Sequence, residues 1–311
     1  MAVTRVGHVE LFSADLDRSA DFYVDVLGLI ETERDDDHVY LRCLEDREHH
    51  TLILTRAAGN GLGHIGFRVD DPADLDALAA AYRADGIDVV EVDAEEERAQ
   101  GPAIRLRDPL GFPVEFYHRV EPVARTLRTH GNRGPSRLDH LNLRLPGPVD
   151  AGVAYYRERL GFLISEYALH PDGTTFAAWL HRKQTTHDVA LVQGPGTLIH
   201  HVGLYVPESH DVLHVADRMA ARGMQAQIEF GPGRHGITNA FFSYIRDPDD
   251  NRIEIYSGDY LIPDPDFEPV AWTAEEFEAT GRLAWGARPP ASMYEGQPVA
   301  DWSRPPARAS A

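Results

Sequence analysis

The amino-acid sequence predicts an α+β protein built from four βαβββ modules that pair into two domains. Its most informative feature is internal repetition, because residues 7–29 and 139–162 each read as a strand, a turn, an amphipathic helix and a glycine stop. Residues 64–87 and 201–224 repeat that order a second time. A strand and helix patterned in this way cannot bury their apolar faces alone, so each module needs a partner. The length of 311 residues also suits about two domains.

The second module of each domain ends in a predicted hairpin. The stretches RLRDPLGFPVEFY at 105–117 and YIRDPDDNRIEIY at 244–256 both place a tight-turn sequence between β-branched and aromatic runs. Alternation in the last run puts Arg252, Glu254 and Tyr256 on one face of a strand, where Arg252 and Tyr256 could orient Glu254 or simply pack. Because burying a carboxylate alone is very costly, Glu254 needs a cation or a hydrogen-bond partner.

The repeat also predicts the domain organisation. We expect an N-terminal domain at 1–122, a polar linker punctuated by Gly and Pro at 123–137, a C-terminal domain at 138–258 and an extension at 259–311. The extension is expected to hold one short helix and to lie over the C-terminal domain, with Trp272, Trp285 and Tyr294 as apolar anchors. Its last ten or so residues are expected to be disordered.

Composition limits the classes of partner and compartment. Fifty acidic residues against 30 Lys and Arg give a formal charge of −20, which argues against nucleic acid or anionic membrane as the main partner. Cys43 is the single cysteine, so an intrachain disulfide and a Cys-rich metal site are excluded. The N-terminus lacks a signal-type apolar region and no apolar run approaches the ~18 residues of a membrane span. We expect a soluble cytoplasmic protein.

Two histidines supply partners for Glu254. His140 and His201 occupy the same point of the first strand in two paired modules. Two imidazoles and one carboxylate bind a divalent metal on one face and leave the other face open, as in non-heme Fe(II) oxygenases. A lone strand histidine is usually structural, so this hypothesis depends on all three residues together with the repeat. The neighbouring His200 should face the other way on its strand, and we interpret it as structural.

Several long motifs resemble one family. They are DHLN (139–142), AAWLHRKQTTHD (177–188), HHVGL (200–204), GPGRHGITNAFF (231–242) and RDPDDNRIEIYSGDY (246–260). Together with the four modules they resemble the type I extradiol ring-cleaving catechol dioxygenases of the vicinal oxygen chelate superfamily, and in particular those that act on 3,4-dihydroxyphenylacetate. The resemblance implies two paired vicinal-oxygen-chelate domains, Fe(II) with Mn(II) possible, O2 as co-substrate, a muconic semialdehyde product and a homotetramer or other homo-oligomer.

The resemblance also implies roles for individual residues. His140, His201 and Glu254 match the metal ligands, and His187, His235 and Tyr244 match residues around the catechol hydroxyls and the oxygen. We assign proton transfer to His187, because an unperturbed histidine pKa of about 6.5 suits it. Pocket positions are matched by Asn142, Trp179, Phe230 and Arg282. The alternatives are a surface His187 in a polar loop and packing roles for Tyr244 and Trp179.

The N-terminal half carries a similar set of residue types. His8, His64 and Glu115 match the C-terminal triad, and His49 lies near the position that matches His187. However, Arg105 occupies the N-terminal position that matches Tyr244 of the C-terminal half. An arginine directed at a divalent cation would repel it. We therefore place the working site in the C-terminal domain and interpret the N-terminal triad as a relic of duplication or a weak second site. The acidic stretch at 93–100 is expected to be a solvated loop.

One departure bears on the substrate. Enzymes that act on 3,4-dihydroxyphenylacetate carry an arginine just before the GPGRHG stretch, where this sequence has Phe230. Arg282 matches a second arginine of that group. Losing one charge-assisted hydrogen bond removes about 1.5–3 kcal/mol. The expected substrate is therefore catechol or a less acidic alkyl- or chlorocatechol, with 3,4-dihydroxyphenylacetate as the alternative.

Two rival classes remain open on the same fold. A glyoxalase-like isomerase or thiol transferase also chelates vicinal oxygens, but it does not need His187, His235 and Tyr244 together. A non-catalytic binding protein of the bleomycin-resistance type would have no metal ligands in its pocket, which is at odds with the His140, His201 and Glu254 set.

Overall fold

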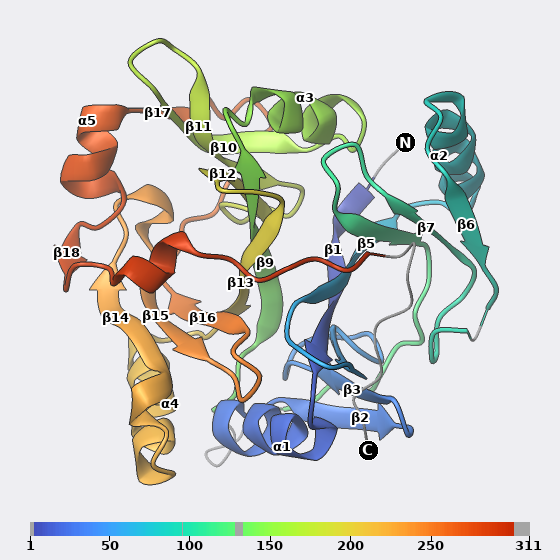
Figure 1. Cartoon of the computed structure of the whole chain (residues 1–311), viewed down its shortest axis with the longest axis horizontal. Helices are drawn as coiled ribbons and strands as arrows, with labels where there is room; N and C mark the ends of the chain where they lie inside the picture. Colours follow the sequence, from blue (N-terminus) through green and yellow to red (C-terminus); the bar gives the residue numbers. More distant parts are fainter. Residues whose placement is uncertain (1–2, 95, 128–132, 302–311) are drawn as a thin grey trace.

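The computed structural model describes residues 3–94, 96–127 and 133–301, and it contains two large mixed sheets (Figure 1). The N-terminal sheet has eight strands in the order β2-β3-β4-β1-β5-β8-β7-β6. Its strands are β1 (Val3–Ser13), β2 (Ile30–Arg34), β3 (His38–Arg42), β4 (Leu52–Arg56), β5 (Leu62–Val69), β6 (Val89–Val92), β7 (Ala103–Arg107) and β8 (Pro113–Tyr117). Its helices are α1 (Leu16–Asp21), which continues as the π-helix η1 (Phe22–Leu27), and α2 (Ala73–Ala84).

The C-terminal sheet has ten strands in the order β17-β10-β11-β12-β9-β13-β16-β15-β14-β18. Its strands are β9 (Arg137–Pro146), β10 (Leu163–Leu169), β11 (Thr175–His181), β12 (Val189–Gly194), β13 (Leu198–Tyr205), β14 (Ile228–Arg234), β15 (Phe241–Arg246), β16 (Arg252–Ser257), β17 (Val270–Thr273) and β18 (Trp285–Gly286). The helical elements are α3 (Asp150–Glu158), α4 (Ser209–Ala221), η2 (Gln225–Gln227), η3 (Ile237–Asn239), α5 (Ala274–Glu276), η4 (Phe277–Gly281) and η5 (Ala291–Tyr294).

The order of elements confirms the four predicted βαβββ modules. Each begins with a long strand, continues through a helix and closes with three strands, and the first and second modules share one sheet, as do the third and fourth. The helix stops predicted at glycine are also present. Gly28 has φ +86°, and a Cβ there would lie 2.9 Å from Gly134 Cα, so both the backbone and the close approach require glycine.

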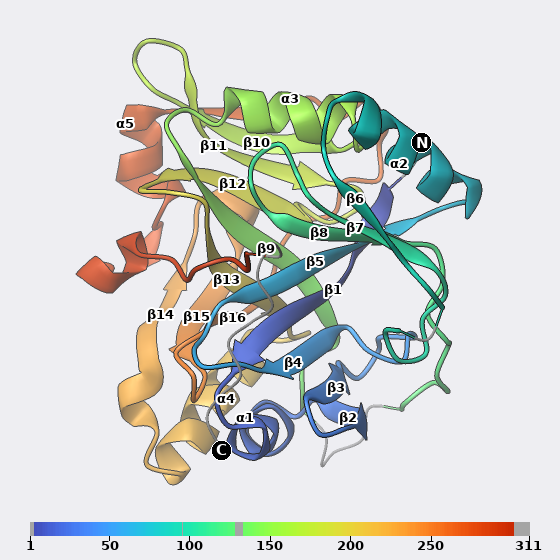
Figure 2. The same cartoon turned by 45° about the vertical axis from the view of Figure 1, so that its right-hand side comes forward.

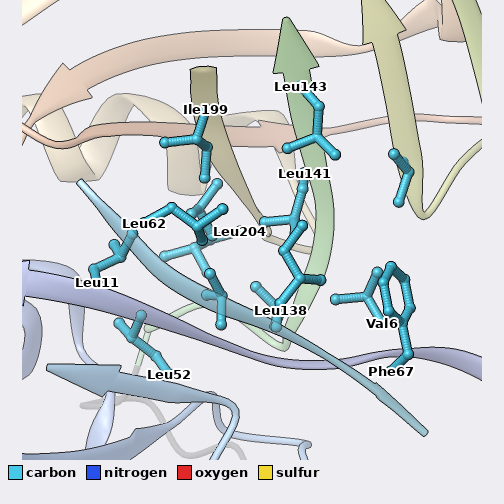
Figure 3. Packing of buried hydrophobic residues seen from close by; sticks show 14 of the residues in the cluster. Val6, Leu11, Leu52, Leu62, Phe67, Leu138, Leu141, Leu143, Ile199 and Leu204 are labelled. Carbon is cyan, nitrogen blue, oxygen red and sulfur yellow. The ribbon is translucent and has the colours of Figure 1, made fainter. Parts of the chain in front are cut away.

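The two sheets share one apolar core. Figure 3 shows Leu11 and Leu62 of the N-terminal sheet close to Leu141 and Ile199 of the C-terminal sheet, all of them almost fully buried. Helices from the two halves also meet in pairs (Figures 1 and 2). On α2 and α3, the hydroxyls of Tyr82 and Tyr155 lie 2.5 Å apart. The domains are therefore packed firmly against each other.

The chain after β16 covers the C-terminal domain. Strand β17 pairs with the edge strand β10, and β18 pairs with the other edge strand, β14. The segment then crosses toward the N-terminal sheet (Figure 1), where Leu62 donates its N–H to the carbonyl of Pro298 at 2.9 Å. The short predicted helix is confirmed as α5 and η4. The predicted disordered end concerns residues 302–311, which lie outside the described residues.

Two of the predicted anchors of this extension are wrong. Trp285 is 51% exposed and Tyr294 is 55% exposed, whereas Phe277 and Met293 are buried in their place. Trp272 does anchor the segment: it packs against an apolar cluster that includes Trp179 and Phe277, and its indole N–H donates to the buried carboxylate of Glu166 at 2.7 Å. Within the described part of the chain, none of the helices is long and apolar enough to cross a membrane.

Candidate active site

Three neighbouring strands of the C-terminal sheet bring the predicted triad together. His140 comes from β9, His201 from β13 and Glu254 from β16, and all three side chains are buried. In the register of these strands, Gly203 stands opposite both His140 and Glu254. A Cβ on Gly203 would lie 2.3 Å from Cε1 of His140. The glycine therefore makes the room in which the imidazole turns toward the other two ligand atoms.

The triad has the spacing of a single metal ion. The Nε2 atoms of His140 and His201 lie 3.1 Å apart, and each lies 3.0 Å from Oε2 of Glu254. Ligands that form bonds of about 2.1 Å at right angles to a common ion are about 3.0 Å apart. The three atoms thus match one face of an octahedron. Among the described residues, this group lies close enough together to hold a metal ion.

The charges of the triad favour a cation. Burial raises the pKa of Glu254, but the two histidines outweigh it and hold that pKa well below its ordinary value, so the group is a carboxylate. Burial lowers the pKa of His140, yet the hydrogen bonds with Asp139 and Glu254 raise it to about 9, so the imidazole holds a proton that a bound cation would displace. Burial lowers the pKa of His201 to about 4, which keeps its imidazole neutral, as a ligand must be. In the described part of the chain no lysine or arginine pairs with Glu254.

Of the two alternatives for Arg252 and Tyr256, direct orientation of Glu254 is not the one observed. Neither Arg252 nor Tyr256 bonds to Glu254: Arg252 donates to Glu229 at 2.7 Å, and Tyr256 donates to Asp139. Asp139 in turn lies 3.2 Å from Nδ1 of His140. A carboxylate behind a ligating histidine fixes the ring and strengthens its basicity.

The expectation for His200 is also wrong. A register shift between Ile199 and His201 interrupts the alternation of β13, so His200 does not turn away. Its Nδ1 lies 2.7 Å from Nδ1 of His201, and its Nε2 lies 2.8 Å from the carbonyl oxygen of Met293. His200 therefore links a triad histidine to the C-terminal extension.

Three further predicted residues surround the triad. The ring of His187 lies 4.0 Å from that of His140, and His187 is buried rather than on the surface of a polar loop. Burial, with His140 nearby, lowers the pKa of His187 well below 6.5. Burial and Glu254 raise the pKa of Tyr244 well above 10, so its phenol stays protonated.

His235 is held in one orientation by the extension. Its Nδ1 lies 2.5 Å from the carbonyl oxygen of Arg282, which can only accept a hydrogen bond, so Nδ1 carries the proton. The other ring nitrogen is then an acceptor, and it lies 3.1 Å from the hydroxyl of Tyr244. The carbonyl of Arg282 thereby sets the direction in which Tyr244 donates its proton.

These residues open into one cavity of about 460 Å³, within the range of small-molecule sites. Asn142, Trp179, Phe230 and Arg282 all line it, as predicted. The extension forms its roof, and the residues it contributes are Ala274, Phe277, Glu278, Arg282, Leu283, Pro289, Met293 and Tyr294. Arg282 pairs with Glu278 and donates to the hydroxyl of Tyr294 at 2.8 Å.

Among the lining residues that the sequence interpretation missed is a cation, Arg144. It follows His140 and Asn142 on β9 at every second position, and all three line the cavity. The signal that could have identified it is the period of two along the strand, whereas Asn142 was predicted from the resemblance.

The N-terminal triad is assembled less regularly. Nε2 of His8 lies 2.8 Å from Nε2 of His64 but 3.4 Å from Oε1 of Glu115, and His64 lies 3.9 Å from that oxygen. The carboxylate of Glu115 is already occupied, by Arg105 at 2.6 Å and by the amide of Gln100 at 2.7 Å.

Arg105 also binds Glu97 at 2.9 Å. Glu97 and Gln100 are buried, so the expectation that residues 93–100 form a solvated loop is wrong in part. The loop folds inward because Arg105 and Glu115 lie beneath it, and sequence patterning alone did not indicate this.

Two histidines and one carboxylate that can occupy one face of a metal ion, inside paired βαβββ modules, are typical of metalloenzymes of the vicinal oxygen chelate type. The family model described as "Glyoxalase/Bleomycin resistance protein/Dioxygenase superfamily" matches residues 5–116 and 137–255. The chain belongs to this superfamily and, within it, to the type I extradiol ring-cleaving dioxygenases.

Relatives and solved structures support this placement. The chain is 34% identical to a manganese-dependent 2,3-dihydroxybiphenyl 1,2-dioxygenase of Geobacillus genomosp. 3, over 91% of this chain and 93% of the relative. It is 32% identical to a metapyrocatechase of Geobacillus stearothermophilus, over 96% and 94%. The crystal structure of homoprotocatechuate 2,3-dioxygenase from Arthrobacter globiformis matches with a TM-score of 0.91 and 40% identity, over 97% of this chain and 94% of that one.

Proposed function

We propose that the C-terminal domain, residues 138–258, carries the dioxygenase reaction on a catechol, and that His140, His201 and Glu254 bind its metal. The observation that carries this is the triangle of ligand atoms, 3.0, 3.0 and 3.1 Å on a side, at the wall of the cavity. The proposed ion is Fe(II), with Mn(II) as an accepted substitute, because this ligand set suits both. A relative at 34% identity is named as manganese-dependent.

The ion would make the catechol hydroxyls more acidic and would allow electron density to pass from the ring to O2. The protein residues supply the remaining requirements. His187 is neutral at pH 7, so it can accept the proton of a substrate hydroxyl and return it later. Its Nδ1 lies 3.0 Å from Oγ1 of Thr186, which leaves Nε2 for the substrate.

Tyr244 acts on the substrate oxygens as a donor, and His235, whose Nε2 is an acceptor, positions the hydroxyl of Tyr244. The phenol of Tyr244 is protonated, and His235 is oriented by the carbonyl of Arg282. Asn142 adds a buried amide oxygen without a partner in the described structure, at the cavity wall. Trp179 and Phe230 provide flat apolar surface for the ring, which excludes water from it.

The test is anaerobic reconstitution with Fe(II), and separately with Mn(II), followed by addition of catechol and then air. A yellow ring-opened product that forms only in the metal-loaded protein, with one ion per chain by elemental analysis, is expected. If catechol, 4-methylcatechol and 3,4-dihydroxyphenylacetate all stay uncleaved with both ions, the proposal is wrong.

We also propose a homo-oligomer, with a homotetramer as the specific expectation. Light scattering coupled to gel filtration measures this directly, and a mass close to the 34.6 kDa of one chain would contradict it.

A further inference from the structure

Arg144 is a cation at the wall of the cavity with no anionic partner. Its Nη1 and Nη2 donate only to the carbonyls of Gln193 and Met293, each at 3.3 Å, and its Nε has no partner in the described structure. No carboxylate of the described residues pairs with it, whereas its neighbours are paired: Arg252 binds Glu229, and Arg282 binds Glu278. Arg144 is half-buried with its Nε covered, and a charge held there without a counter-ion is unfavourable, so the fold leaves room for an anionic partner that it does not itself supply.

The surroundings of Arg144 do not remove its charge. Burial lowers its pKa most, and the nearby Arg252 and Arg282 lower it further, to about 10. The guanidinium is therefore still protonated at neutral pH. Of the charged side chains in the cavity, Glu254 faces the two triad histidines and Glu278 is matched by Arg282. Arg144 remains as one uncompensated positive charge.

The position of Arg144 on β9 indicates which part of a bound catechol it would face. It lies four residues beyond His140 on β9, about 13 Å along the strand at ~3.3 Å per residue. Asn142 lies between them on the same face, and Phe230 also lines the cavity. A catechol whose hydroxyls lie at the triad would direct the opposite edge of its ring, and any substituent there, toward the end of the cavity that Arg144 occupies.

We propose that Arg144 determines specificity by binding a carboxylate on the substituent of the catechol, so that the preferred substrate is a catechol with a short carboxylate-bearing arm. This inference rests on the proposed ring-cleaving function and deepens it. A guanidinium offers two parallel N–H donors to a carboxylate, and Arg144 has donors to spare. The long-range field of a chain with charge −20 repels anions, so the attraction must be local.

This inference changes the expectation drawn from Phe230. An aromatic residue at that position removes one cation from the pocket, but Arg144 brings another from a different strand. The pocket therefore keeps a positive charge for a substituent, and an uncharged catechol would leave that charge without a partner.

The experiment compares 3,4-dihydroxyphenylacetate with 4-ethylcatechol, which has a similar arm without the carboxylate, on the metal-loaded protein. We expect the ratio of kcat/KM for the two to be at least about tenfold in favour of the carboxylate, as expected of a charge-assisted pair. Arg144→Gln should lower this ratio at least about tenfold, and Arg144→Lys should lower it less because it keeps the charge but not the two parallel donors.

Two results would overturn the inference. One is a ratio near one in the wild-type protein, which needs no variant to fold. The other is a ratio that Arg144→Gln leaves unchanged while Arg282→Gln abolishes it, which would assign the carboxylate to Arg282.

A failure of the ring-cleaving function is distinguishable from a failure of this inference. If neither catechol is cleaved, anaerobic titration calorimetry of the metal-loaded protein with the same two compounds replaces kinetics. Tighter binding of the carboxylate, lost in Arg144→Gln, would support Arg144 even then, and equal affinities would overturn it.

Discussion

The two domains share their modules and their ligand types but differ at the residue opposite the carboxylate. In the hairpin β15–β16, Tyr244 pairs in register with Glu254, and in the hairpin β7–β8, Arg105 pairs in register with Glu115. The arginine binds Glu115 directly and so takes the place of a metal as counter-charge. The tyrosine stays neutral and brings no counter-charge to Glu254. Both domains bring two histidines and a glutamate together, and they differ in whether the residue beside the carboxylate carries a charge.

The domains also differ behind the histidines. Asp139 precedes His140 and contacts its Nδ1, whereas Gly7 precedes His8, whose buried Nδ1 has no partner in the described structure. His64 does have a carboxylate behind it, since Glu10 lies 2.7 Å from its Nδ1. Support for the ligands is therefore complete in one domain and partial in the other.

The strongest test of this comparison is the pair Glu254→Gln and Glu115→Gln. Removing the carboxylate ligand should lower metal retention more than about a hundredfold, because even supporting partners of ligands contribute 10–100-fold. Ring cleavage should fall to the level of the metal-free protein. Glu115→Gln should keep both. Metal content by elemental analysis and product absorbance measure the two effects, and the reverse pattern would move the working site to the N-terminal domain.

The next test is His187→Asn against His49→Asn. His187 lies in the cavity, so its loss should lower kcat by about 10²–10⁴, the usual contribution of proton transfer, with metal content unchanged. His49 lies 3.3 Å from Glu33 in the N-terminal domain and is not among the described residues that line the cavity, so its variant should cleave at the wild-type rate. Steady-state kinetics decides this. Equal rates for wild type and His187→Asn would remove His187 from the reaction.

A smaller effect is expected from Asp139→Asn, which makes the support of His140 resemble that of His8. The amide loses the negative charge behind the imidazole, and metal affinity should fall about 10–100-fold. Competition with a chelator of known affinity measures it. The thermal stability of the metal-free variant serves as the control, and an unchanged affinity would show that the spacing of the three ligand atoms suffices.

The smallest expected effect is a gain in the N-terminal domain. Arg105→Met should free Glu115 and raise the metal stoichiometry above one per chain, through a weak second site without activity. Arg105→Lys keeps a positive charge and should remain at one. If Arg105→Met also remains at one, the 3.9 Å separation of His64 and Glu115, rather than the arginine, prevents binding.

Much of the architecture could be predicted because repeats and alternation are local patterns. They placed the four modules, the hairpins and the triad, and they matched Arg105 with Tyr244. The errors occurred where the outcome depends on register shifts or on distant packing. A bulge redirected His200, and the burial of Glu97 depended on its ion pair with Arg105. The predictions for Trp285 and Tyr294 were wrong because aromatic residues in a sequence do not reveal which rings pack against another part of the protein.

The position of the extension at the end of the chain has a consequence for biosynthesis. All three triad residues precede it, so they emerge from the ribosome before the roof of the cavity exists, and chains grow at about 5–20 residues per second. The last roof residue, Tyr294, follows Glu254 by forty positions. The triad residues are therefore made before the roof, and an ion that reached them before the extension closed over the cavity would need no later opening of the roof.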